Sequence, residues 1–115
     1  MDKQLTDYQT IITEVLRYYA GLPAINRPGD EAEEQLILDT ERDHYQILTI
    51  GWEQGKRVYY PVFHLDIKDG KIWVQEDATD FDLVGKLEER GVPKHDIVLG
   101  FHPAYKRAMG EYAVA

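Results

Sequence analysis

Residues 58–75 read VYYPVFHLDIKDGKIWVQ, and this stretch decides the fold. Two runs of alternating side chains flank Asp69-Gly70, a pair typical of a two-residue β-hairpin because both turn residues must accept positive φ. Closing the turn on Lys68 and Lys71 sets the register of the two strands. The predicted opposite pairs are Ile67 with Ile72, Asp66 with Trp73, Leu65 with Val74, and His64 with Gln75.

This register divides the side chains of the hairpin between two faces, because side chains alternate along a strand with period two. One face is entirely apolar and carries Phe63, Leu65, Ile67, Ile72 and Val74. The other face is mixed and carries Val62, His64, Asp66, Trp73 and Gln75. The apolar face belongs to the core, whereas the large aromatic Trp73 stands on the polar side of the hairpin.

Upstream of the hairpin, residues 35–39 and 45–52 read as two further strands joined by the polar loop 40–43. Short connections between consecutive strands predict an antiparallel meander of four strands. Pro61 donates no backbone hydrogen bond, so we expect a bulge or a break in pairing near Tyr60-Pro61. Both upstream strands are apolar on both of their faces, so we expect both faces to be covered.

Helices are predicted on either side of the strands. Between residues 6 and 19, apolar side chains recur at steps of three and four, with Asp2 or Thr6 as the N-cap. Residues 21–30 form a connector with no periodicity. A second helix is expected from Thr79 to Arg90, with the interior Gly85 costing about 1 kcal/mol relative to alanine. A last helical turn follows residues 101–103 and reaches Met109.

These elements predict one domain over residues 1–115 of the α+β class, with two layers. A four-stranded antiparallel meander sheet would be covered on one face by the long N-terminal helix and the helix near residues 79–90. A chain of 115 residues buries roughly two-thirds of its unfolded surface, enough for one core.

Composition narrows the classes of protein. The chain is 43% hydrophobic and 30% charged, and its apolar runs are far shorter than the roughly 20 residues that span a bilayer. It has no cysteine, which excludes disulfides and cysteine-based zinc sites. Its first residues lead into an amphipathic pattern rather than a signal peptide. We therefore expect a cytoplasmic protein with no membrane partner.

The charge is strongly negative, with 21 acidic residues against 13 lysines and arginines and a net charge of −8. Tight binding to DNA needs a basic face that contacts phosphates, so direct, tight DNA binding is not expected. Seven acids gather in residues 30–43, against the single base Arg42. Such a run is usually a solvated edge, and the alternative is a surface that steers a basic partner.

The chain contains neither serine nor cysteine, so a Ser-His-Asp or Cys-His catalytic arrangement is impossible. Asp66 with Glu76 or Asp77 could form an acid–base pair, but an acidic chain produces such pairs by chance. One acid-x-Lys match to a metal-dependent nuclease, residues 69–71, lies in the hairpin turn. We predict no catalytic residue and no cofactor.

Histidines raise the question of a metal site. His64 and Asp66 share a strand face, and zinc accepts both donor types, but a site needs three or four ligands. His44 or His102 would have to complete the set, and Trp73 across from Asp66 would crowd the ligands. The sequence favours a hydrogen-bonded surface pair over a metal site.

Aromatic side chains indicate instead a surface for association. Trp73, Tyr59 or Tyr60, and residues 101–103 supply groups that are enriched in interface cores, with ordinary packing as the alternative for each. The chain also ends in the apolar residues 112–115. The candidate interface residues are Trp73, His64, Asp66, Phe101, His102 and Pro103, and we expect a homo-oligomer.

Blocks spread over nearly the whole chain resemble the XisI family, named for a controlling factor in excision of the cyanobacterial fdxN element. The blocks are DTERD at 39–43, GW at 51–52, HLDI at 64–67, DGKIWVQ at 69–75, GVPK at 91–94 and DIVLGFHP at 96–103, with YAVA at the end. The chain diverges from the family pattern at residues 21–34 and 77–89.

The resemblance implies a small α+β domain that acts beside a XisH-like companion of endonuclease-like fold and a site-specific recombinase. It supplies no catalytic residues. The leading hypothesis is a non-enzymatic regulator that binds the XisH-like protein, the recombinase, or both. A second hypothesis is an acidic antidote that neutralises a DNA-cutting, XisH-like toxin. A third is a metal-dependent hydrolase centred on His64 and Asp66.

Overall fold

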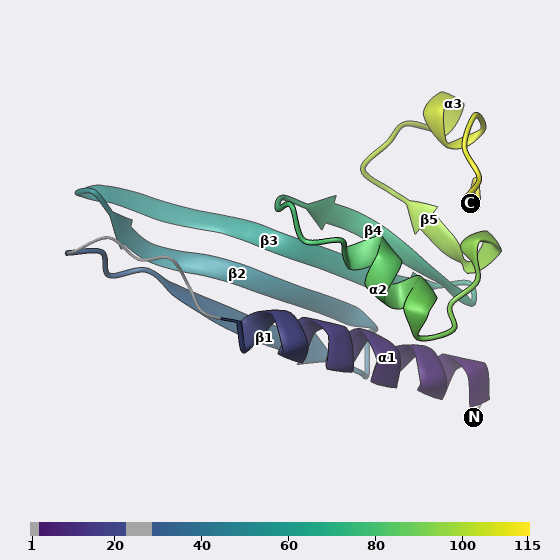
Figure 1. Ribbon diagram of the computed structural model, residues 1–115, viewed down its shortest axis with the longest axis horizontal. Coiled ribbons are helices and arrows are strands. Elements are labelled where there is room, and N and C mark those ends of the chain that lie inside the picture. Colours follow the sequence, from purple (N-terminus) through teal and green to yellow (C-terminus); the bar gives the residue numbers. More distant parts are fainter. Residues whose placement is uncertain (1–2, 23–28) are drawn as a thin grey trace.

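The computed structural model describes residues 3–22 and 29–115, and it has the predicted α+β class (Figure 1). Helix α1 (Lys3–Ala20) precedes a meander of four antiparallel strands. These strands are β1 (Glu33–Asp39), β2 (His44–Glu53), β3 (Lys56–Lys68) and β4 (Lys71–Asp77). The chain ends with α2 (Leu83–Glu89), a 3-10 turn (Lys94–Asp96), β5 (Ile97–Leu99) and α3 (Ala104–Arg107).

The sheet has a fifth strand that the sequence did not predict. Its order is β1-β2-β3-β4-β5, and β5 runs parallel to β4, with Ile97 beside Ile72. The prediction of four strands is therefore wrong by one. Strand β5 is only three residues long, too short for an alternating pattern, and it reaches β4 by a crossover through α2 rather than by a hairpin.

The hairpin between β3 and β4 confirms the predicted turn. Asp69 and Gly70 both have positive φ, of 52° and 77°. Four predicted pairs are present, from Lys68 with Lys71 to Leu65 with Val74. The fifth is wrong: His64 lies opposite Glu76 rather than Gln75, because a β-bulge between His64 and Leu65 inserts one residue into β4.

A second bulge confirms the break expected near Tyr60-Pro61. Ile47 pairs with Phe63, whereas Leu48 pairs with Pro61, so Val62 is the extra residue of β3. Val62 belongs to the hydrophobic core and is only 3% exposed. Its predicted place on the polar face is wrong because the bulge interrupts the alternation of side chains.

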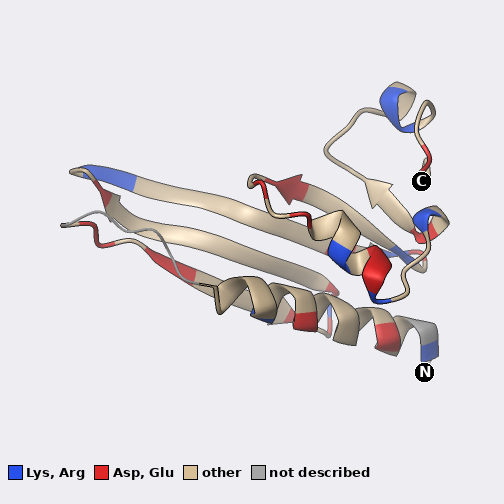
Figure 2. Ribbon diagram, in the orientation of Figure 1, with Lys and Arg blue, Asp and Glu red and all other residues tan. Residues whose placement is uncertain are grey.

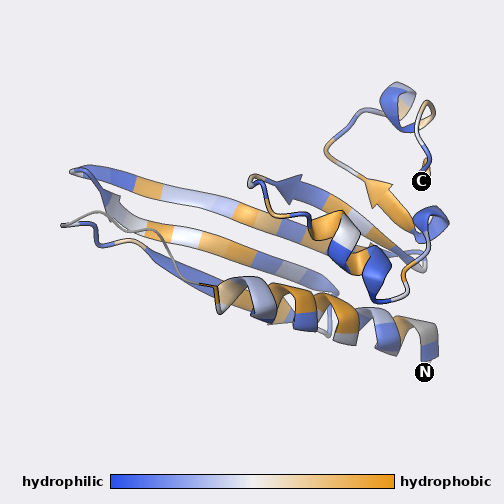
Figure 3. Ribbon diagram, viewed as in Figure 1, coloured by the Kyte–Doolittle hydropathy of each residue, from blue (hydrophilic) through white to orange (hydrophobic). Residues whose placement is uncertain are grey.

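One face of the sheet is covered by α1 and α2, as predicted (Figure 1). Apolar segments of these helices and of the central strands together form the core (Figure 3). Rings from α1, β3 and the start of the α2 region meet there: the centroids of Tyr19 and Phe63 are 4.8 Å apart, and those of Tyr19 and Phe81 are 5.2 Å apart. We call the opposite face of the sheet the open face.

The helix ends differ from the predicted ones. Helix α1 begins at Lys3, so the proposed N-cap Thr6 lies inside the helix. The other proposed N-cap, Asp2, lies outside the described residues, as does most of the connector. Helix α2 begins four residues later than predicted because Asp82 is its N-cap and accepts a hydrogen bond from the Gly85 backbone. A Cβ on Gly85 would lie 2.0 Å from the Asp82 carboxylate, so glycine leaves room for this cap.

In the described part of the chain, no helix has both the length and the apolar character needed to cross a membrane.

Candidate functional site

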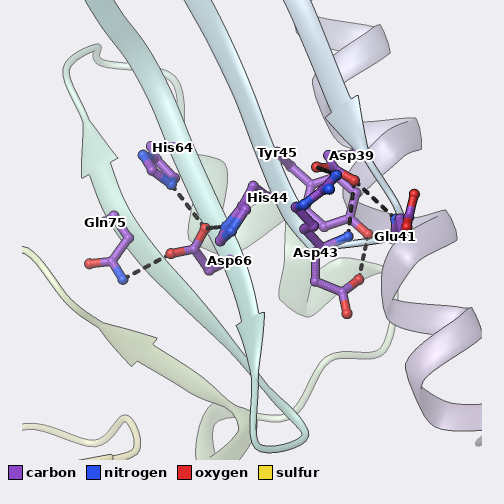
Figure 4. Close-up of polar contacts among 9 residues, drawn as sticks. Asp39, Glu41, Asp43, His44, Tyr45, His64, Asp66 and Gln75 are labelled. Atoms are coloured by element: carbon purple, nitrogen blue, oxygen red, sulfur yellow. Dashed lines mark hydrogen bonds and ion pairs between the residues drawn. The ribbon is translucent and has the colours of Figure 1, made fainter.

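Two histidines and one aspartate meet on the open face (Figure 4). His44 of β2 lies directly opposite Asp66 of β3, and His64 lies two residues before Asp66 on the same strand. His44 Nδ1 is 2.7 Å and His64 Nε2 is 2.9 Å from the same oxygen, Asp66 Oδ1. The other carboxylate oxygen, Oδ2, accepts a hydrogen bond of 3.2 Å from Gln75 Nε2. We call His44, His64 and Asp66 the His–Asp cluster.

The electrostatics of the cluster keep Asp66 ionised. Burial acts to raise the pKa of Asp66, but hydrogen bonds from His44, His64 and Gln75 outweigh it, and the pKa lies below its usual value. The exposed fractions of the side chains are 17% for Asp66, 30% for His64 and 53% for His44. Asp66 is therefore a charged acceptor at the base of the cluster, and His44 is its outermost member.

Replacing Asp66 with asparagine is expected to remove a pH-dependent part of the stability. Because folding lowers the pKa of Asp66, its stabilising contribution is complete above the unfolded pKa of about 3.9 and is lost as the pH falls through the folded pKa. Urea unfolding from about pH 6 down to about pH 3 should show the stabilities of wild type and Asp66→Asn converging below about pH 4. Curves that stay parallel over this range would contradict the assignment.

Trp73 lies across from Asp66 on β4, but it is half-buried rather than freely exposed. Lys68 Nζ is 4.6 Å and Arg107 Cζ is 5.5 Å from the centroid of its ring, so two cations flank the indole. Gly100 also packs against it, since a Cβ there would lie 3.2 Å from Trp73 Cε3. The segment after β5 therefore touches the open face at Trp73.

The segment of Phe101, His102 and Pro103 follows directly from this contact. Phe101 and Pro103 are exposed, and the ring centroids of Phe101 and His102 are 4.5 Å apart. The backbone oxygen of His102 accepts a hydrogen bond of 2.7 Å from Arg107. A mostly apolar cavity of about 360 Å³ opens beside His102, between α3 and the C-terminal residues.

The structure thus brings the six candidate interface residues into one continuous region, which we call the Trp73 region. It runs from His64 and Asp66 through Trp73 to Phe101, His102 and Pro103, with Gly100 as the link. Contact of this region with a partner stays a prediction. From the sequence, His44 was only one possible metal ligand, and its position beside Asp66 was not predicted. This position follows from the bulge in β3.

The predicted carboxylate pair of Asp66 and Asp77 is not brought together. Asp77 lies opposite the core residue Phe63, whereas Asp66 lies on the open face. Burial raises the pKa of Asp77, and its Oδ1 atom is buried without a hydrogen-bond partner. Glu76 lies directly opposite His64 on the neighbouring strand.

A second exposed apolar area lies on the part of β2 and β3 that extends beyond the helices (Figure 1). Trp52 and Tyr59 are exposed there on the open face, as is Ile37 of β1, whereas Tyr60 is exposed on the opposite face of the sheet. The expectation that both faces of these strands are covered is not met among the described residues. Lysine and arginine occupy the tip of this hairpin, at the start of β3 (Figure 2).

The acidic residues of 30–43 have two roles (Figure 2). Some hold local structure: Asp39 accepts hydrogen bonds from the Glu41 and Arg42 backbones, and Asp43 accepts from Gln9 and Tyr45. Others are exposed and remain available to solvent or to a basic partner, namely Glu31, Glu33, Glu34 and Glu41.

Comparisons with known proteins agree with the resemblance. The family model described as XisI protein matches residues 1–114. A XisI-like protein from Anabaena variabilis is 45% identical, with a TM-score of 0.88 over 96% of this chain and 99% of that chain. The fdxN element excision controlling factor XisI from the same organism is 38% identical, with a TM-score of 0.83 over 98% of this chain and 100% of that chain. No curated protein matches the chain.

Proposed function

Because the chain belongs to the XisI family, we propose that it is a non-enzymatic controlling factor of DNA element excision that acts by binding a protein. The proposed partner is a XisH-like protein of nuclease fold, a site-specific recombinase, or both. The observation that carries this proposal is the 38% identity to an excision controlling factor over the full length of that protein. The partner and the non-enzymatic mode of action are our inference.

The chemistry of the chain supports a binding role. It has no serine or cysteine, which excludes Ser-His-Asp and Cys-His catalysis, and its net charge of −8 disfavours direct contact with DNA phosphates. Several large aromatic side chains are exposed, among them Trp52, Tyr59 and Phe101. Aromatic groups on a surface are typical of protein interfaces.

We place the partner contact at the Trp73 region. The indole of Trp73 is held by the sheet beneath it and by the flanking cations Lys68 and Arg107, so little side-chain freedom is left to lose on binding. Phe101 stands exposed at the edge of the same region. A rigid, central tryptophan beside an exposed aromatic residue is the arrangement expected of an interface hot spot.

Trp73→Ala is expected to weaken the complex with the XisH-like companion. A hot-spot residue contributes at least about 2 kcal/mol, which corresponds to a loss of roughly 30-fold in affinity. Co-purification and calorimetric titration of the two proteins measure this loss. Tyr18→Ala is the matched control, because Tyr18 is an exposed aromatic residue on α1, away from the open face. If Trp73→Ala changes neither complex formation nor self-association, the interface lies elsewhere.

The exposed acids of residues 30–43 favour one alternative role, that of an antidote which covers the basic, DNA-contacting surface of a toxic companion. Expression of the companion alone separates the two roles. Growth inhibition that co-expression of this chain relieves would support the antidote. Normal growth with the companion alone would exclude the antidote and leave the controlling factor.

A further inference from the structure

The His–Asp cluster has the donor set of a transition-metal site. Imidazole nitrogen and carboxylate oxygen are both ligands of Zn²⁺ and of related divalent ions. One donor atom each from His44, His64 and Asp66 lies within 4.8 Å of the other two. Three protein ligands are the number found in open zinc sites, which keep a further position for water or another group.

The sheet fixes where these ligands stand. His44 and Asp66 are opposite partners on neighbouring strands, and His64 shares the face of Asp66 two residues away. Gln75 Nε2 holds Asp66 Oδ2, which directs the remaining oxygen, Oδ1, toward both imidazoles. A hydrogen bond that orients a ligating carboxylate is a common feature of metal sites.

Only small movements would convert the hydrogen-bonded cluster into a coordination shell. Donor atoms around tetrahedral zinc are about 3.4 Å apart, given metal–ligand bonds of about 2.0–2.1 Å. The two histidine nitrogens now lie 2.7 Å and 2.9 Å from Asp66 Oδ1. Rotation of the His44 ring, which is 53% exposed, can open this space without moving the backbone.

The carboxylate of Asp66 has no lysine or arginine in an ion pair among the described residues. Among these residues, its ion pairs are with His44 and His64. Lys68 and Arg107 lie instead over the Trp73 ring. Because Trp73 is on β4 and His44 is on β2, the indole and the outer ligand approach Asp66 from opposite sides. The crowding by Trp73 that argued against a metal therefore does not block the ligands.

We propose that His44, His64 and Asp66 bind one divalent transition-metal ion of the Zn²⁺ class, with Gln75 as a positioning residue. The outward coordination position faces solvent at the His64 and Asp66 end of the Trp73 region, where water or a side chain of a second molecule can occupy it. The site requires no catalytic activity, so it can be tested independently of the proposed regulatory role.

Titration of the untagged protein with ZnCl₂ or CoCl₂ alone tests the site. We expect one equivalent of metal per chain and, with Co²⁺, the visible absorption of a tetrahedral complex. His64→Ala and Asp66→Asn should abolish the stoichiometric binding and this absorption. Gln75→Ala should retain the stoichiometry and weaken the affinity by about 10-fold, as expected for a residue that orients a ligand.

His95→Ala is the matched control. His95 also lies beside an aspartate, with Nε2 3.8 Å from Asp96 Oδ1, but no third donor completes a group there among the described residues. Binding that survives in this variant and disappears in His64→Ala supports the proposal. Binding of less than one equivalent to the wild type, or equal loss in His95→Ala, overturns it. Imidazole proton shifts in NMR spectra, restricted to His44 and His64 on addition of Zn²⁺, identify the ligands without any substitution.

Discussion

Phe63→Ala is expected to lower the free energy of unfolding by about 3–5 kcal/mol, the usual cost of truncating a buried phenylalanine. Phe63 is completely buried in β3, between the sheet and the helices. Its ring centroid is 4.8 Å from that of Tyr19 in α1 and 5.9 Å from that of Phe81 before α2. Alanine would leave a cavity where both helical elements pack on the sheet.

Urea unfolding followed by circular dichroism measures this effect, with an unchanged slope m showing that the unfolded states are comparable. Tyr59→Ala is the control on the same strand, because Tyr59 is 66% exposed and its loss should change the stability by no more than about 0.5 kcal/mol. Equal losses in the two variants would mean that Phe63 does not anchor the helices to the sheet.

Local chemistry explains why the β3–β4 hairpin could be predicted from the sequence. Asp69 and Gly70 specify a two-residue turn, and the turn sets the pairing of the next four positions. The alternation of Phe63 and Leu65 then selects the buried face. These features depend only on residues that are near one another in the chain, so the sequence alone is enough to predict the turn, the register and the buried face.

The His–Asp cluster could not be predicted in the same way, because it depends on a bulge. At the start of β3, Glu53 of β2 pairs with Lys56, and Leu48 pairs with Pro61. If this register continued without a bulge, His44 would lie opposite Leu65, on the core face. The extra residue Val62 shifts the register by one and sets His44 opposite Asp66. Pro61 indicates that a bulge is near, but not which residue it displaces.

Elements that depend on distant packing were also missed. Strand β5 is defined by its pairing with β4, and its three apolar residues carry no signal that separates a strand from a buried loop. The predicted start of α2 at Thr79 was wrong because Asp82 is the N-cap. The Asp82 carboxylate caps the helix through Gly85, whereas Thr79 Oγ1 accepts from the Phe81 backbone in the preceding turn.

Gly51→Ala is expected to destabilise the fold by more than about 2 kcal/mol, although it adds only one methyl group. Gly51 has a φ of 144°, which favours glycine, and a Cβ there would lie 2.2 Å from the backbone oxygen of Glu31 and 2.6 Å from Ala32 Cα. Both contacts are with backbone, so no side chain can rotate away. The chain entering β1 would have to separate from β2 and lose the hydrogen bond from the Glu31 amide to Trp52.

Gly55→Ala separates the cost of the positive φ from the cost of the close backbone contact. Gly55 also has a positive φ, of 75°, but no atom lies within 4 Å of the position of its Cβ. It should therefore show only the conformational cost of about 1–2 kcal/mol. Chemical denaturation gives both losses, and hydrogen exchange should show faster exchange of the β1 amides in Gly51→Ala alone. Equal destabilisation and equal exchange in the two variants would mean that β1 does not pack closely on Gly51. A larger loss at Gly51 would mean that close backbone contact at this position holds the edge strand, and with it the exposed acids Glu31, Glu33 and Glu34, in place.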